Sequence, residues 1–376
     1  MFWSPDSRSY RSVADWVLGN GVSTNALIIP VLYPLIIAIG RLIDSNFGIW
    51  GLQFIMWIIS GLILYRILKI ATRNYYLTVL GLIIYTGNVT LILLTLHALT
   101  EVTAIFLISV LIAWIINIKD IEQNHYWSLV LFILSLLVLI KPIFISVWLI
   151  LLIYQMVTFI YYRINRQINW KYLGFLVIAI LPILVQVSLM KITFNQFTIS
   201  NIGAFTLKKY LFARVYADIN LISVEQARND TVLYSQNEIY MYLMAHFNTT
   251  IESYVKNIAK NIISNSNFVN FPRPNNYLFV YMRLVNIGYF FIHVMMVPIS
   301  IIVSIQLFRK RLWNEFIIIL SLMLLLFVIF SSSGITFSQG DRILLPSLPI
   351  WIILYCTVFS RSFISAKEKT MHARMR

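Results

Sequence analysis

The residue in this sequence best suited to acid–base chemistry is Asp6, in the opening segment Ser4-Pro5-Asp6-Ser7-Arg8-Ser9-Tyr10. A carboxylate can take a proton from a hydroxyl or an amine that lies within hydrogen-bonding distance. We therefore expect Asp6 to act as a general base, with Tyr10 in contact with substrate. The alternative is that Asp6 caps a helix starting at Ser7, since aspartate is favoured at helix N-caps. Asp15 and Asp44 compete for the catalytic role, and we expect Asp15 to face solvent.

Two later cations, Lys141 and Arg342, could bind a phosphate group. Arginine offers paired hydrogen bonds to phosphate oxygens, and lysine supplies a compact positive charge. Each lies at the end of an apolar run, where a lipid headgroup would sit. The alternative is that these long side chains only extend toward the membrane surface, as basic residues commonly do.

His97 and Glu101 lie four residues apart and would share one face of a helix. Such a pair could bind a donor sugar or a divalent metal ion. One histidine and one glutamate are a weak metal signal, and a polar helix cap is the simpler explanation of the pair. We place both residues in the substrate site and expect no cofactor, with a divalent metal ion as the alternative.

The composition predicts a protein that crosses the membrane several times. Of the 376 residues, 60% are hydrophobic and 11% are charged, whereas soluble domains carry about 25% charged residues. Cys356 is the single cysteine, which excludes a disulfide framework or a cysteine-based metal site. The net charge of +15 fits cytoplasmic loops facing anionic lipid, and we expect no nucleic-acid partner.

The apolar runs that must position these residues predict a helical bundle, since a membrane span needs about 20 apolar residues. Pro142 must end or kink a helix, because proline cannot continue the backbone hydrogen bonds. Residues 25–43 contain Pro30 and Pro34, so this segment either crosses the membrane or lies at its surface. The nine expected spans are 48–69, 76–96, 100–118, 127–141, 143–162, 171–192, 282–307, 313–331 and 343–360.

Short basic connections identify the cytoplasmic side, where lysine and arginine are enriched. They follow the first, fifth, seventh and ninth spans. Residues 1–47 and the alternate connections therefore face outward, namely His97–Glu101, Lys141-Pro142, 193–280 and Ser331–Arg342. Residues 193–280 are too long for a structureless loop, and we expect them to form an extracytoplasmic cap of short helices. This cap separates the membrane helices of 48–192 from those of 281–360, and residues 361–376 form a basic cytoplasmic tail.

Several motifs together resemble the GT-C-type integral membrane glycosyltransferases, which include the protein O-mannosyltransferases and the bacterial lipid A aminoarabinose transferases. "PDSRSY" followed by "PVLYPLIIAIG" resembles the first external loop of that family. The other motifs resemble the acid-led start of a family helix, a basic-proline helix break and the segment that opens a late helix. They are "LTEVTAIFLISVL" (Leu99–Leu111), "LLVLIKPIFISV" (Leu136–Val147) and "GDRILLPSLPIW" (Gly340–Trp351).

The resemblance implies transfer of a sugar from a polyprenyl-phosphate carrier to a lipid, glycan or protein acceptor. It also implies a multi-pass α-helical protein of a bacterial inner membrane, with its active site on the periplasmic face. Asp6 would be the base, Lys141 and Arg342 would contact the phosphate, and His97, Glu101 and Tyr10 would line the substrate site. Family members begin with a membrane helix ahead of the acidic loop. We therefore expect either a truncated or mis-started chain, or 25–43 as the first span.

Two other classes of protein remain as alternatives. A transporter or flippase of a lipid-linked solute would carry internal repeats and polar residues deep in its spans, and we find neither in the sequence. An O-antigen polymerase or ligase would share the lipid-linked donor. Its chemistry would depend on arginines of the long external segment, namely Arg214, Arg228 and Arg273.

Overall fold

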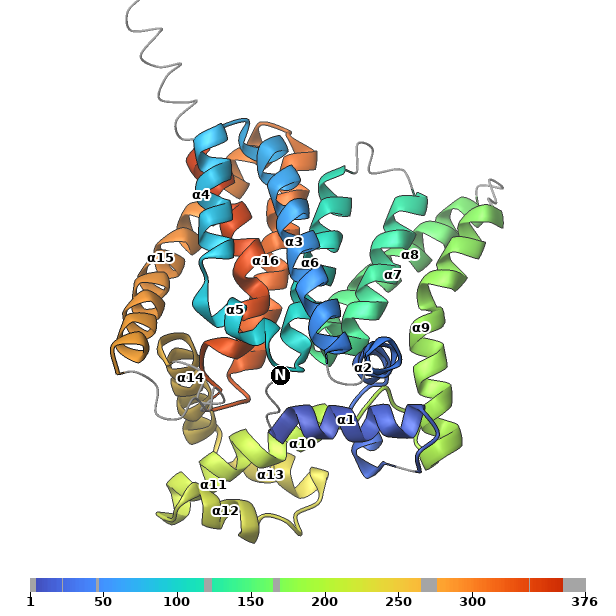
Figure 1. Ribbon diagram of the computed structural model, residues 1–376, viewed down its shortest axis with the longest axis vertical. Coiled ribbons are helices and arrows are strands. Elements are labelled where there is room, and N and C mark those ends of the chain that lie inside the picture. Colours follow the sequence, from blue (N-terminus) through green and yellow to red (C-terminus); the bar gives the residue numbers. More distant parts are fainter. Residues whose placement is uncertain are drawn as a thin grey trace, which may run out of the picture.

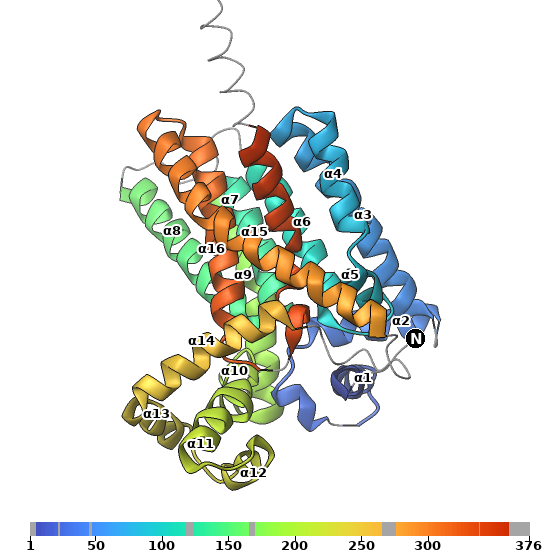
Figure 2. The ribbon, with the colours of Figure 1, turned by 90° about the vertical axis from the view of Figure 1, so that its left-hand side faces the viewer.

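The computed structural model describes residues 5–21, 23–44, 47–117, 124–164, 170–264, 276–337 and 339–360, and every regular element among them is a helix or a helical turn. Long apolar helices lie side by side, and short helices gather at one end of them (Figures 1 and 2). The expectation of an all-helical chain is confirmed.

Six helices of the described residues are long and apolar enough to cross a membrane. Helices suit this environment because each backbone polar group is hydrogen-bonded within its own segment. Their outer surfaces carry large apolar side chains, such as Ile153 on α8 and Phe327 on α16. The six are α3 (Gly48–Thr72), α6 (Thr100–Asn117), α8 (Ile145–Ile164), α9 (Trp170–Phe194), α15 (Asn276–Arg309) and α16 (Trp313–Ser333).

The other three expected spans are shorter or broken. The prediction of one continuous helix over 76–96 is wrong, because this segment forms two helices bent by 53°. Gly87 ends the first helix, and Asn88 starts the second by accepting a hydrogen bond from the amide of Leu91 at 2.8 Å. The elements concerned are α4 (Tyr75–Thr86), α5 (Val89–Thr95), α7 (Asn124–Ile140) and the last helix, Leu345–Ser360.

The opening segment lies across the long helices instead of parallel to them. Its helices α1 (Pro5–Val17) and α2 (Leu32–Ile43) are joined through the turn η1 (Thr24–Leu27), and Figure 1 shows α2 end-on. With 12 residues, α2 is shorter than the roughly 20 residues of a membrane span. Residues 25–43 therefore do not form a single spanning helix.

Five short helices occupy the described part of the segment that was expected to form a cap. They gather near α1, at the end of the bundle opposite the α3–α4 connection (Figures 1 and 2). Aromatic packing holds them together, since the ring of Phe212 lies 5.4 Å from the rings of both Tyr234 and Tyr242. Residues 265–275 lie outside the described residues. The elements are α10 (Ile202–Thr206), the π-helical turn η3 (Leu207–Phe212), α11 (Ala213–Asn220), α12 (Val224–Asp230), α13 (Gln236–Ala245) and α14 (Phe247–Ile263).

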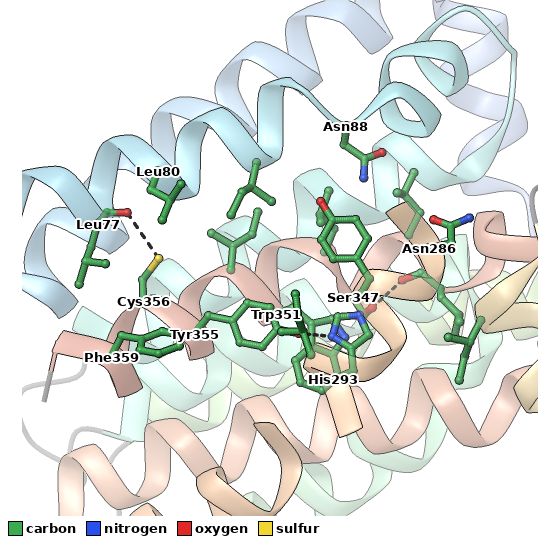
Figure 3. A pocket seen from close by; sticks show the side chains of 18 residues that line it. Leu77, Leu80, Asn88, Asn286, His293, Ser347, Trp351, Tyr355, Cys356 and Phe359 are labelled. Carbon is green, nitrogen blue, oxygen red and sulfur yellow. Dashed lines mark hydrogen bonds between the residues drawn. The ribbon is translucent and has the colours of Figure 1, made fainter. Parts of the chain in front are cut away.

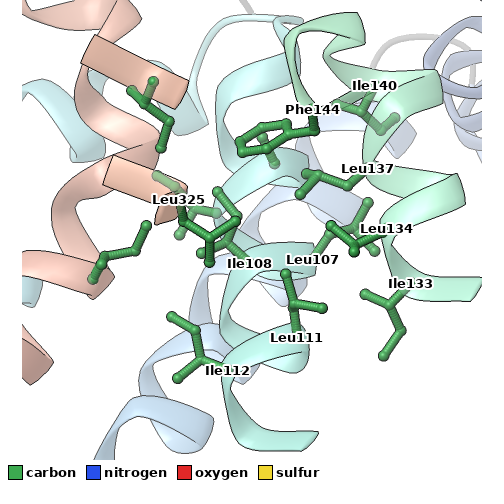
Figure 4. Close-up of a cluster of buried hydrophobic side chains, with 14 of the residues drawn as sticks. Leu107, Ile108, Leu111, Ile112, Ile133, Leu134, Leu137, Ile140, Phe144 and Leu325 are labelled. Carbon is green, nitrogen blue, oxygen red and sulfur yellow. The ribbon is translucent and has the colours of Figure 1, made fainter. Parts of the chain in front are cut away.

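The core of the bundle forms around α6, the most buried of the six long helices. Leu107 and Leu111 of α6 lie in one apolar cluster with Leu134 and Leu137 of α7 and with Leu325 of α16 (Figure 4). Because α6 lies between its neighbours, the polar side chains of its first turn, Thr100 and Glu101, are buried inside the protein.

Helices α2 and α3 cross with their backbones in contact at two glycines. A Cβ atom on Gly48 would lie 1.8 Å from the carbonyl oxygen of Gly40, so no side chain fits there. Small residues allow membrane helices to approach this closely. The contact fixes α2 against α3, and the side-chain pair between Asp15 and Arg41 in turn ties α1 to α2.

Replacing Gly48 by alanine should lower the melting temperature (Tm) of the full-length protein in detergent. The added methyl group forces α2 away from α3, and overpacking of this kind costs about 1–3 kcal/mol. Gly51→Ala is the matched control, because a Cβ at Gly51 on the same helix meets no atom within 4 Å. Alanine favours a helix over glycine, so the control should keep or raise Tm. Equal Tm values for the two variants would contradict the contact.

Candidate active site

Four charged side chains from distant parts of the chain meet at the end of the bundle beside α1. Arg342 Nη1 donates a hydrogen bond to Asp6 Oδ2 at 2.8 Å, and Arg342 Nε donates to Glu101 Oε1 at 2.9 Å. Lys141 Nζ donates to the same Glu101 oxygen at 3.3 Å. We call Asp6, Glu101, Lys141 and Arg342 the ion-pair cluster. It brings together four of the six residues predicted for the site.

Each member of the ion-pair cluster lies where a helix begins or ends. Asp6 and Glu101 occupy the first turns of α1 and α6. Lys141 separates α7 from the turn η2 (Pro142–Phe144), as the helix-ending effect of proline predicts. Arg342 lies in the turn η4 (Gly340–Ile343), which precedes the last helix. Helix ends allow side chains from four separate elements to point at one place.

The ion pairs share one buried carboxylate and one buried guanidinium, so they depend on one another. The side chain of Glu101 is 2% exposed and that of Arg342 is 9% exposed, whereas Asp6 is 52% exposed. Burial alone would lower the pKa of Arg342, but the carboxylates of Glu101 and Asp6 outweigh it and raise that pKa further above its usual value. Arg342 is therefore positively charged at every physiological pH. Its charge balances two carboxylates with the help of Lys141.

Asp6 combines a fixed position with access from solvent. Among the described residues, α1 runs from Pro5 to Val17, so Asp6 lies inside its first turn and the alternative that it caps a helix starting at Ser7 is wrong. Arg342 holds Oδ2, and Oδ1 has no hydrogen-bond partner among the residues that the structure describes. The competing carboxylates are engaged elsewhere, since Asp15 pairs with Arg41 and Asp44 accepts from the amide of Phe47 at 2.7 Å.

Tyr10 lies one helical turn after Asp6 and packs edge-on against Tyr33, with ring centroids 5.0 Å apart. Burial raises the pKa of the Tyr10 hydroxyl, and the negative charge of Glu101 raises it further. The hydroxyl therefore stays protonated and can act as a hydrogen-bond donor. Behind these rings, Gln53 Nε2 donates to the carbonyl oxygen of Leu99 at 3.0 Å, which fixes the start of α6 next to Glu101.

His97 is the sixth predicted residue, and it is also buried near the ion-pair cluster. Burial lowers its pKa to about 4, and the positive charge of Arg342 acts in the same direction. The imidazole is therefore neutral at pH 7. Among the described residues there is no group of three His, Cys, Asp or Glu side chains arranged to hold a metal ion. The guanidinium of Arg342 would also repel a cation bound to His97 and Glu101.

The sequence analysis did not identify two further groups of polar residues, one beside the ion-pair cluster and one within the long helix α15. The first includes Tyr210 of the turn η3, whose hydroxyl accepts a hydrogen bond from Gln339 Nε2 at 3.2 Å. Gln339 precedes Arg342 by three residues. Burial raises the pKa of Tyr210, the charge of Asp6 raises it further and that of Arg342 lowers it, so this tyrosine lies near the ion-pair cluster. The sequence carries no signal for Tyr210, since its segment is rich in tyrosine throughout.

The second missed group surrounds His293, within the long apolar helix α15. Its ring stacks on Trp351 of the last helix at 4.0 Å, and its Nδ1 contacts the hydroxyl of Tyr355 (Figure 3). A histidine inside a candidate membrane span is a functional signal that the sequence did contain. These side chains line a cavity of about 300 Å³ between α4, α15 and the last helix. Its lining residues in that last part of the chain run from Leu344 to Phe359.

The arginines of the polymerase or ligase alternative have different surroundings. Arg214 pairs with Asp218 one turn away at 3.0 Å. Arg228 lies over the rings of Tyr210 and Phe337, at 5.5 Å and 5.1 Å from their centroids. Arg273 lies outside the described residues. Of the two that are described, Arg228 is therefore the one that lies beside a residue near the ion-pair cluster.

Comparison of the chain with family models, with curated proteins and with solved structures found no match in any of the three.

Replacing Glu101 by glutamine should strongly destabilise the protein, because Arg342 and Lys141 would lose their shared carboxylate. Removing one partner of a buried ion pair typically costs about 3–5 kcal/mol. Thermal unfolding of the full-length protein in detergent measures the effect. Glu252→Gln is the control, because Glu252 forms an exposed pair with Lys256 on α14 and its loss should leave Tm unchanged. If both variants melted like the unmodified protein, Glu101 would not be the central anion of the cluster.

Proposed function

We propose that this protein is an integral membrane glycosyltransferase of the GT-C type. It transfers a sugar from a polyprenyl-phosphate carrier to a lipid, glycan or protein acceptor. The observation that carries the proposal is the ion-pair cluster, in which a half-exposed carboxylate lies 2.8 Å from a buried arginine at one end of an apolar bundle. This reaction needs a base for the acceptor and a cation for the departing phosphate, and the cluster offers both.

In the proposed reaction, Asp6 takes the proton from the acceptor hydroxyl or amine as that group attacks the anomeric carbon of the sugar. The bond between this carbon and the phosphate oxygen breaks, and its electron pair remains on the phosphate. Arg342 and Lys141 stabilise the negative charge that develops there, which is a general means of lowering such a barrier. The phosphate would compete with Asp6 for Arg342 Nη1, and its arrival would release the carboxylate to the acceptor.

The cavity along the last helix supports a lipid-linked donor. Leu344 and Leu345 are among its lining residues and follow Arg342 in the chain by two and three residues. Most of the lining side chains are apolar (Figure 3). A polyprenyl chain in this cavity would have its phosphate at the cluster. Binding sites of this kind combine an apolar lining with a few placed polar groups. Glu101 Oε2, buried and without a hydrogen-bond partner among the described residues, could accept from a sugar hydroxyl.

The distribution of charge supports a site on the outer face of a bacterial inner membrane. The α3–α4 and α15–α16 connections lie at the end of the bundle away from the short helices (Figures 1 and 2). They carry basic residues such as Arg73 and Arg309, and connections of this kind face the cytoplasm. On this proposal α10–α14 are the extracytoplasmic cap. The spans number nine when the bent pair α4–α5, α7 and the helix Leu345–Ser360 are added to the six long helices.

A flippase or transporter of a lipid-linked solute is the second candidate, and His293 favours it. This histidine lies in a candidate membrane span and lines two cavities, one of about 300 Å³ and one of about 360 Å³. Ionisable residues at such depth mark solute pathways in transporters. The glycosyltransferase is preferred because the charged cluster lies at the end of the bundle.

Asp6→Asn should abolish sugar transfer from a polyprenyl-phosphate sugar in proteoliposomes, because an amide cannot take the proton of the acceptor. General-base catalysis contributes about 10²–10⁴-fold. The control is Asp15→Asn on the same helix, whose partner is Arg41, and it should retain transfer. Full activity in Asp6→Asn would eliminate this carboxylate as the base.

Arg342→Lys should raise the KM for the donor about tenfold while the KM for the acceptor stays within twofold. Lysine keeps the charge but loses the paired hydrogen bonds of the guanidinium, and a hydrogen bond to a charged group contributes about 1.5–3 kcal/mol. Arg214→Lys, in the cap, serves as the control and should change neither KM. An unaltered donor KM in Arg342→Lys would count against phosphate binding at this residue.

A further inference from the structure

The connection between α16 and η4 is held by one buried side chain from the short helices. Asn261 of α14 is 0% exposed. Its Nδ2 donates to the carbonyl oxygens of Ser333 at 2.9 Å and Thr336 at 2.8 Å. Its Oδ1 accepts from the amides of Gln339 at 3.3 Å and Gly340 at 3.2 Å. A carboxamide has two donor hydrogens and two acceptor lone pairs, so Asn261 uses its full capacity on this connection.

The partners of Asn261 lie at both ends of the connection, so its side chain holds the two ends together. Two other residues on the same face of α14 add to this contact. Asn257 Nδ2 donates to the carbonyl oxygen of Gly334 at 3.1 Å, and the Tyr254 hydroxyl donates to that of Ser331. Residues at these spacings lie along one side of a helix. The contacts also satisfy buried backbone groups that no helix ladder provides for.

The contact lies directly beside the ion-pair cluster along the chain. Gly340 accepts the constraint with a φ of +63°, a conformation that suits glycine. Only Asp341 separates this glycine from Arg342, whose guanidinium must reach Glu101 at 2.9 Å and Asp6 at 2.8 Å. A shift of the backbone at Gly340 would therefore move Arg342 relative to both carboxylates.

We propose that Asn261 is a positioning residue for Arg342, through its four hydrogen bonds to the 333–340 backbone. It touches neither carboxylate of the cluster and acts only through the backbone it holds. Because Asn261 belongs to α14, a shift of α14 would also move the guanidinium of Arg342. The inference concerns the geometry of the ion-pair cluster, and only its kinetic test rests on the proposed function.

The first experiment measures hydrogen exchange in the full-length protein in detergent. Asn261→Ala should speed exchange at the amides of Gln339 and Gly340 at least about tenfold, which corresponds to about 1.4 kcal/mol, with no change in α11 and α13. Asn261→Asp keeps an acceptor for these two amides, so it should retain more protection than the alanine variant. Asn257→Ala is the matched control, because the buried Asn257 of the same helix hydrogen-bonds, among the described residues, to Gly334 and to neither of these amides. It should leave both amides protected. Unchanged exchange in Asn261→Ala would overturn the proposal.

The second experiment tests whether the effect reaches Arg342. The loss of Tm caused by Glu101→Gln should fall to less than half in an Asn261→Ala background, because a displaced Arg342 no longer depends on that carboxylate. Losses that simply add would show a structural role alone and would overturn the proposal, since independent sites are additive. If the alanine variant does not fold, Gly340→Ala takes its place, because its positive φ is strained for alanine.

The third experiment is kinetic and separates this inference from the proposed function. Asn261→Ala should raise the donor KM as Arg342→Lys does, and it should add nothing to the effect of Arg342→Lys in the double variant. An undiminished effect in the double variant would overturn positioning. If no sugar transfer is detected in the unmodified protein, the proposed function fails, and the exchange and Tm experiments still decide the role of Asn261.

Discussion

The charge of Arg342 has to be neutralised inside the protein, because its side chain is only 9% exposed. Removing an ion from water costs several kcal/mol unless good partners replace its hydration. Glu101 and Asp6 provide those partners from the first turns of α6 and α1, so these helices and η4 cannot be placed independently of one another. Lys141 balances the remaining negative charge. Because it lies at the break between α7 and α8, its contact with Glu101 also fixes that break relative to α6.

Much of this cluster could be predicted because charged residues are rare in an apolar chain. Glu101, Lys141 and Arg342 each lie at the end of an apolar run, where few other charged residues are available as partners. They are therefore expected to pair with one another. The apolar runs likewise indicated the long helices with good accuracy. The opening segment was harder, since two prolines left its path undecided until α2 was found lying across the bundle.

Other features depend on tertiary contacts that leave no distinct pattern in the sequence. Asn261 lies in an asparagine-rich segment, and only the approach of α14 to the 333–340 backbone distinguishes it from its neighbours. The bend lies where Gly87 ends α4 and Asn88 caps α5 by accepting from the amide of Leu91, within an otherwise apolar stretch. Gly48 is one of 13 glycines, and nothing nearby marks it as a helix crossing. His293 is different, because a histidine in an apolar run was visible and was overlooked.

The order of these residues along the chain has a consequence for biosynthesis. Glu101 and Lys141 are 40 residues apart, whereas Arg342 follows Glu101 by 241 residues and Asp6 by 336. The ribosome therefore delivers Lys141 long before Arg342, so the lysine is the first of these two cations that is available to pair with Glu101. The guanidinium arrives with the final helix and completes the charge balance last. A chain released before residue 342 lacks the hydrogen bonds that Arg342 makes to Glu101 and Asp6.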